Sequence, residues 1–198
     1  MQTECQRVSL RLSGAWANLK DHQILTLTQL LSSLTAMETL SITADMDSAE
    51  LWESLRGLNI KSLSLKGTQG RLKVEYIAWL SQSLSTLTQP ETLIMNANTY
   101  SDIHLTQSLK SINFSYERLF PWELRELVNK LIELNQIIQC ILEFDCSRRI
   151  DEYITIKQEL DEMTHVEVNR LRIYHRSRDT YMENTEYTIS MKLLINCD

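Results

Sequence analysis

An internal duplication is the feature of this sequence that most restricts how the chain can fold. Residues 60–95 align with residues 7–42 without a gap, and sixteen of the 36 positions are identical. The identical pairs include Leu10/Leu63, Leu12/Leu65, Leu19/Leu72, Leu27/Leu80, Leu31/Leu84, Leu34/Leu87 and Leu40/Leu93. Because the spacing of the apolar residues is preserved throughout, the duplication predicts two copies of one structural unit.

A short strand-like pattern recurs along the chain. In residues 60–67, Leu63 and Leu65 fall on one face of an extended strand, and the polar residues beside them fall on the other face. The first leucine of each successive strand core, or the residue that replaces it, is Leu10, Leu40, Leu63, Leu93, Ile112, Leu142 and Leu171, at steps of 30, 23, 30, 19, 30 and 29 residues. Steps of this length, each with room for one strand and one helix, predict a repeat array.

The repeats resemble the leucine-rich repeat family, in the helix-containing intracellular form found in ribonuclease inhibitor and in the C-terminal repeats of NACHT-type immune receptors. The asparagine or cysteine that usually follows the strand is absent or replaced, at Gly14, Gly67 and Asn96, and cores five to seven are degenerate. The resemblance covers nearly the whole chain. It implies an α/β solenoid, or horseshoe, with parallel strands on the concave face and helices on the convex face.

Apolar residues at helical spacing follow most of the cores. We expect a helix from about Asp21, a short helix that starts near Asp47 or Ser48 and continues through Leu58, and a third helix that includes Val74. Pro121 is expected at the first position of a further helix. A helix through Tyr153, Ile154, Lys157, Leu160 and Met163 is expected between cores six and seven, and only a helical turn between residues 100 and 109.

The end of the chain changes period. Tyr187, Ile189, Met191, Leu193 and Ile195 alternate with polar residues, which is typical of a strand. We expect residues 168–198 to form a capping hairpin, because the last unit of an array must cover an open edge of the core. The whole chain, residues 1–198, is interpreted as a single repeat domain.

Composition excludes several classes of protein. With 43% hydrophobic and 23% charged residues the chain is globular, and its net charge of −6 disfavours nucleic acid as a partner. No apolar run is long enough to span a membrane and no signal peptide is evident, so we expect a cytoplasmic protein that does not bind membranes. The four cysteines and four histidines are scattered, which indicates buried free thiols, no metal site and no cofactor.

The residues that flank the apolar strand positions should form a solvent-facing surface. In the first cores these residues are mostly serine and threonine, whereas the later cores carry charge and an aromatic side chain. Because tyrosine and arginine are enriched where proteins bind each other, we expect Arg170, Arg172, Tyr174 and Glu143 to contact a protein partner. A solvated, charged edge would need the same residue types. The tryptophans Trp16, Trp52, Trp79 and Trp122 are interpreted as packing residues of the core or of the convex surface, and the basic residues at 148–149 and 170–178 as a solvated face.

The sequence contains no nucleotide-binding, serine-hydrolase or zinc-protease motif, so no catalytic residue is assigned. The function we favour is a non-catalytic scaffold for protein binding, and the resemblance implies the ligand-sensing or regulatory repeats of an innate-immune receptor. One alternative is an enzyme regulator similar to ribonuclease inhibitor, although that protein is rich in cysteine. Another is an α/β enzyme without true repeats, which would need a deep pocket of convergent ionisable groups.

Overall fold

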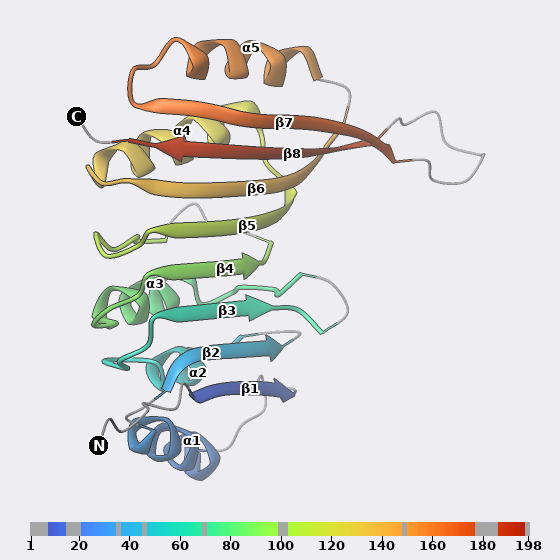
Figure 1. Cartoon of the computed structure of the whole chain (residues 1–198). Helices are drawn as coiled ribbons and strands as arrows, with labels where there is room; N and C mark the ends of the chain where they lie inside the picture. Colours follow the sequence, from blue (N-terminus) through green and yellow to red (C-terminus); the bar gives the residue numbers. More distant parts are fainter. Residues whose placement is uncertain are drawn as a thin grey trace, which may run out of the picture. The chain divides into compact units, whose positions relative to one another are not determined.

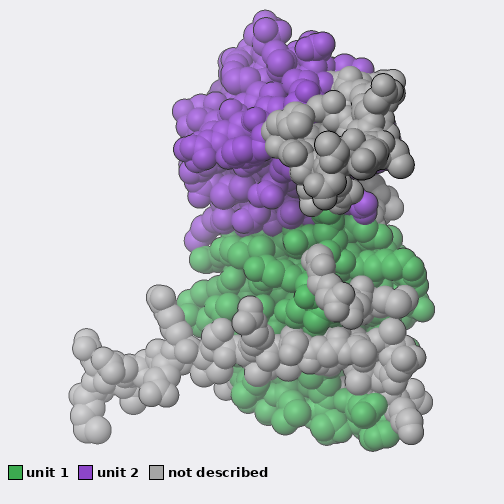
Figure 2. Space-filling model, turned by 90° about the vertical axis from the view of Figure 1, so that its right-hand side faces the viewer, with its two compact units in different colours: residues 1–109 green, residues 110–198 purple. Residues whose placement is uncertain are grey.

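The computed structural model is an α/β protein whose chain divides into two compact units, residues 1–109 and 110–198 (Figure 2). The structure describes residues 8–14, 21–34, 37–44, 47–68, 71–98, 103–147, 150–176 and 186–196. No helix among the described residues is long and apolar enough to cross a membrane.

Unit 1 contains four parallel strands, and each strand pairs with the next strand in the chain (Figure 1). They are β1 (Val8–Gly14), β2 (Met37–Ala44), β3 (Ser62–Lys66) and β4 (Thr92–Asn96). The register places Leu10 opposite Leu40, Leu40 opposite Leu63 and Leu63 opposite Leu93. The four residues that the sequence predicts as equivalent are therefore direct neighbours on adjacent strands.

Three helices connect the strands of unit 1, namely α1 (Asp21–Ser33), α2 (Ala49–Glu53) and α3 (Ile77–Thr86). Figure 1 shows α2 and α3 behind the sheet. The apolar residues of β2, β3 and β4 that alternate with polar ones are buried on this side, together with Trp52 and Leu80. Helix α2 begins where the sequence predicts, because the Ser48 hydroxyl accepts the N–H of Leu51 at 3.2 Å.

Two helix predictions in unit 1 are wrong in extent. Helix α2 ends at Glu53 instead of continuing to Leu58, and turns lead to Gly57, whose φ of 68° is the left-handed conformation that favours glycine. Helix α3 begins at Ile77, so Val74 lies before it, although its side chain is buried. Residues 103–109 contain a turn and no helix.

Unit 2 contains β5 (Ser111–Arg118), β6 (Ile138–Ser147), β7 (Val166–Arg176) and β8 (Glu186–Ile195). β5 and β6 pair in parallel. The two last strands pair antiparallel, in agreement with the predicted hairpin, but β8 also pairs antiparallel with β6. The order is therefore β5-β6-β8-β7, and the last strand of the chain lies inside the sheet (Figure 1).

The sequence predicts that Ile112 of core five aligns with Leu142 of core six, and this register is wrong by two residues. Ile112 lies opposite Cys140, and Phe114 lies opposite Leu142. A shift of two residues leaves every side chain on the same face of the strand, so alternation alone does not fix this register. Cys140, Leu142, Phe144 and Cys146 are all buried, which makes the apolar stripe of β6 longer than the predicted core.

Helices α4 (Pro121–Glu133) and α5 (Ile150–Asp161) belong to unit 2. Pro121 is the first residue of α4, as predicted, and the Glu123 carboxylate accepts the N–H of Phe120 at 2.7 Å. The ring of Tyr153 on α5 packs 5.3 Å from the ring of Phe144 on β6, and its hydroxyl donates to the carbonyl of Leu119. Helix α5 thus packs on the apolar side of this sheet.

The cysteines and tryptophans that the sequence predicts as packing residues differ in how exposed they are. Cys140 and Cys146 are buried and free, whereas Cys5 and Cys197 lie outside the described residues. Trp52 is fully buried. Trp79 and Trp122 are 43% and 60% exposed, so they are surface residues, which the prediction of core or surface packing allows, and Trp16 lies outside the described residues.

Candidate protein-binding surface

The polar face of the unit 1 sheet is made of small hydroxyl side chains. The register aligns Thr39, Ser62 and Thr92 in one row across β2, β3 and β4, and Ser41, Ser64 and Ile94 in the next row. These side chains are half-buried, except Ser64, which is 9% exposed. Lys66 is the one exposed cation described on this face. Such a surface offers hydrogen bonds but little charge.

The corresponding face of unit 2 is charged. Its rows follow from the register of β6, β8 and β7, in that order. One row contains Ile141, Lys192 and Arg170; the next contains Glu143, Ser190 and Arg172; the third contains Asp145, Thr188 and Tyr174. Acidic residues therefore line β6 and basic residues line β7, with mostly small side chains on β8 between them.

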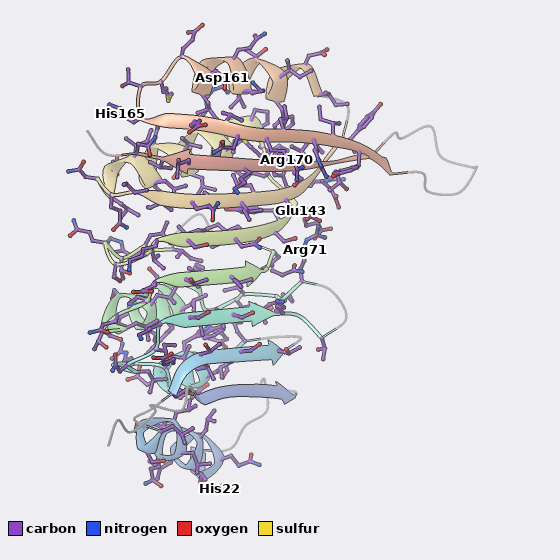
Figure 3. All side chains as sticks on the ribbon, in the orientation of Figure 1. His22, Arg71, Glu143, Asp161, His165 and Arg170 are labelled. Atoms are coloured by element: carbon purple, nitrogen blue, oxygen red, sulfur yellow. The ribbon has the colours of Figure 1, made fainter. Side chains whose placement is uncertain are left out.

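The structure brings the four predicted contact residues to one face of one sheet. Arg170, Arg172 and Tyr174 are exposed on β7, and Tyr174 is 47% exposed. Glu143 is exposed on β6, in the same row as Arg172, with Ser190 between them. Figure 3 marks Glu143 and Arg170 on this sheet. Neighbouring strands are about 5 Å apart, so the backbones of Glu143 and Arg172 are about 10 Å apart.

Two hydrogen bonds join side chains on this face, one along β7 and one between β8 and β6. The guanidinium of Arg172 donates from Nη1 to the hydroxyl oxygen of Tyr174 at 3.2 Å. The hydroxyl of Thr188 donates to Oδ1 of Asp145 at 2.7 Å. Neither bond joins the basic residues of β7 to the acidic residues of β6. The two sets of opposite charges are thus held apart.

Lys192 is a charged residue of this face that is not among the four predicted contact residues. It lies opposite Arg170 because β8 pairs with β7. The sequence itself indicates that β8 is an interior strand and β7 an edge strand. Ile189, Met191, Leu193 and Ile195 of β8 are apolar and buried, which is typical of an interior strand, whereas β7 carries Glu167, Arg170 and Arg172, as edge strands often do.

Unit 2 also contains a cavity of about 210 Å³ at the ends of β5 and β6, lined in part by Arg118, Asp145, Cys146 and Tyr153. Its groups are poorly suited to nucleophilic chemistry. Burial, and then the charge of Asp145, raise the pKa of the Cys146 thiol, which disfavours the reactive thiolate. The Tyr153 hydroxyl is already bonded to a backbone carbonyl.

The remaining basic residues contribute less to the described surface. Arg148, Arg149 and Arg178 lie outside the described residues, as do the side chains of His175 and Arg176. Within the described part of the chain, no group of three or more histidine, cysteine, aspartate or glutamate residues could hold a metal ion.

The sequence matches no known family of proteins and no curated protein.

Proposed function

We propose that the chain is a leucine-rich-repeat-type solenoid that acts as a non-catalytic scaffold for protein binding. The observation that carries the proposal is the charged face of unit 2, defined by β6, β8 and β7. Its charged residues come from three strands, so their spacing is fixed by backbone hydrogen bonds and not by flexible loops. A rigid surface lowers the ordering cost of binding a partner.

The in-order pairing of unit 1 supports the solenoid. In a repeat array each unit contacts its neighbours, and equivalent residues stack along the array. The register that places Leu10, Leu40, Leu63 and Leu93 at directly opposite positions of adjacent strands has this character. The resemblance to immune-receptor repeats places such a scaffold in a cytoplasmic sensor, and this assignment is part of the proposal.

The scaffold is favoured over an enzyme because the described cavities lack convergent, activated groups. An active site is expected to contain ionisable residues whose pKa values suit acid, base or nucleophilic chemistry. Burial raises the pKa of the Cys140 thiol to about 12, and Cys146 shifts in the same direction. Both shifts favour the inert thiol.

Affinity capture with matched variants tests the proposal. The bait is the intact chain, a variant with Arg170, Arg172 and Tyr174 changed to alanine, and a control variant with Trp122, Lys130 and Lys157 changed to alanine. Both triple variants remove two positive charges and one aromatic ring, but the control residues lie on α4 and α5. We expect partner proteins to be retained by the intact chain and the control and lost from the first variant. Equal recovery with all three baits would exclude this face as the binding surface.

A further inference from the structure

Exposed cations outside the sheet faces are generally paired with a carboxylate. Arg125 on α4 contacts Glu159 on α5 through two hydrogen bonds of 2.7 and 2.8 Å. Lys130 contacts Glu126 at 2.8 Å within α4. The charge of each of these side chains is therefore balanced inside the protein.

The cations on the charged face of unit 2 are different. Arg170, Arg172 and Lys192 form no ion pair with any carboxylate that the structure describes, although Glu143 and Glu167 lie on the same face. Arg170 lies directly opposite Lys192, and Arg172 follows two residues further along β7. Like charges directly opposite each other on neighbouring strands destabilise a sheet. The arrangement is therefore unfavourable unless an anion from outside the described chain is bound.

Protection of an open strand edge explains only part of this arrangement. Charged residues and a bulge on an edge strand prevent it from pairing with other strands. This accounts for Arg170 and Arg172, since β7 pairs only with β8 among the described strands and has an irregularity between Val168 and Arg170. It does not account for Lys192, because both edges of β8 are already paired.

We propose that Arg170, Arg172 and Lys192 bind an acidic, extended peptide segment of a partner protein. This inference rests on the proposed function and specifies the chemistry of the partner. Residues two apart on β7 are separated by about 6.5–7 Å, which is also the separation of alternate residues in an extended peptide. Two carboxylates at alternate positions of the peptide thus match Arg170 and Arg172, and the carboxylate over Arg170 also lies beside Lys192.

A peptide fits this surface better than a continuous polyanion does. Glu143 and Asp145 line β6, one strand beyond β8. A nucleic acid or an anionic membrane would cover both strands and be repelled by these carboxylates, whereas a peptide carries separate charges that can be confined to the β7 side. The net charge of −6 also disfavours the binding of a nucleic acid or an anionic membrane.

Fluorescence anisotropy with defined peptides tests the proposal on the full chain. The probe is a labelled peptide of alternating glutamate and serine, and the control peptide has glutamine in place of glutamate. The protein variants are Arg170→Gln, Arg172→Gln, Lys192→Gln and, as a matched control, Lys66→Gln on the face of the unit 1 sheet. Thermal unfolding of each variant establishes that it is folded.

We expect the glutamate peptide to bind at low ionic strength and the glutamine peptide to bind much more weakly. Each substitution on the charged face should weaken binding by about 1.5- to 5-fold, which is the range for exposed ion pairs, and added salt should reduce the differences. Lys66→Gln should bind like the unsubstituted protein. Equal binding of both peptides, or an equal loss with Lys66→Gln, would overturn the proposal.

Competition identifies the source of the anion. Inorganic phosphate or anionic vesicles that displace the peptide at equal charge concentration would overturn the assignment to a peptide. Failure here is distinct from failure of the proposed function. If the glutamate peptide does not bind but the Arg170/Arg172/Tyr174 variant still loses its protein partners, the surface is correct and the acidic chemistry is wrong.

Discussion

The carboxylate of Asp47 accepts a hydrogen bond of 2.6 Å from the indole Nε1 of Trp52, and both residues are buried. The same carboxylate accepts the backbone N–H groups of Glu75 at 2.8 Å and Tyr76 at 3.1 Å. It thus connects the start of α2 to the segment that leads into α3. The N–H of the preceding residue, Val74, is bonded to Oδ1 of Asn98 at 2.9 Å, so side chains accept all three N–H groups of residues 74–76.

Asp47→Ala should destabilise unit 1 by about 2–4 kcal/mol, because the buried indole N–H of Trp52 loses its only assigned acceptor and two backbone N–H groups lose theirs. Urea unfolding measures the loss. Trp52→Phe removes the donor, so the effect of Asp47→Ala should be smaller in that background. If the two effects add without coupling, the contact does not contribute as argued.

Leu63→Ala should cost about 2–5 kcal/mol through a cavity in the core of unit 1. Leu63 is 1% exposed and lies between Leu40 and Leu93 on the neighbouring strands. Leu30→Ala is the matched control, because Leu30 is 58% exposed on α1 and its removal should change stability by no more than about 0.5 kcal/mol. Similar decreases in the free energy of unfolding for the two variants, measured by chemical denaturation, would contradict the burial of Leu63 in the core of unit 1.

The unit 1 strands could be predicted because the duplication aligns them without a gap. That alignment fixes the equivalence of Leu10 with Leu63 and of Leu40 with Leu93, and the register of the strands follows it. The extent of α3 could not be predicted in the same way. Val74 has helical spacing from Ile77, but the acceptors of the N–H groups of residues 74–76 are Asn98 and Asp47, which are distant in the sequence.

The candidate site could be predicted in part for a similar reason. Alternation along β7 indicates that Arg170, Arg172 and Tyr174 face solvent, because this pattern is local. That Lys192 joins them depends on the register of β7 with β8, and that Glu143 lies in the row of Arg172 depends on the long-range pairing of β8 with β6. The predicted hairpin contains the β7–β8 pairing but not the β6–β8 pairing.

Glu159→Gln should reduce stability at neutral pH and have less effect in acid. The hydrogen bonds from Arg125, and then its charge, hold the pKa of Glu159 below its ordinary value. The unfolded chain therefore binds a proton more readily than the folded chain. The stabilisation is present above the ordinary pKa near 4.5 and is lost as the pH falls through the lowered folded value. The pair is exposed, so added salt should also weaken it.

Urea midpoints of Glu159→Gln and the unsubstituted protein, measured at neutral and at strongly acidic pH, check this expectation. The difference between the two proteins should shrink on acidification. Glu133→Gln provides a control on α4, since no ion pair of Glu133 is found among the described residues. A pH-independent difference for Glu159→Gln would show that the substitution acts by something other than the charge of the pair.

The Cys140 thiol should resist alkylation in the native protein at mildly alkaline pH. Complete burial raises its pKa to about 12, so the thiolate fraction is very small and the sulfur is also inaccessible. Mass spectrometry of the peptide that contains Cys140 measures the rate of iodoacetamide modification with and without urea. Modification should follow global unfolding of unit 2. Rapid modification in the native state would mean that β6 does not face the core at this position.

Removal of β8 should unfold unit 2, because β8 is an interior strand and not a dispensable terminal one. Its partners are β6 on one edge and β7 on the other, and Ile189, Met191, Leu193 and Ile195 are buried. A chain that ends at residue 176 would expose the apolar side of β6 and leave two strand edges without partners. We expect this chain to bind a hydrophobic dye and to associate.

A synthetic peptide of residues 186–196, added in trans, should reverse both effects, since the slot between β6 and β7 is specified by their side chains. The same peptide with Met191→Asp should fail, because it would bury an unpaired charge opposite Leu142 and Leu171. If the shortened chain stays monomeric and folded without any peptide, β6 and β7 must be able to pair directly. The shortened chain would then have a charged face without Lys192 and should bind the acidic peptide more weakly than the intact chain does.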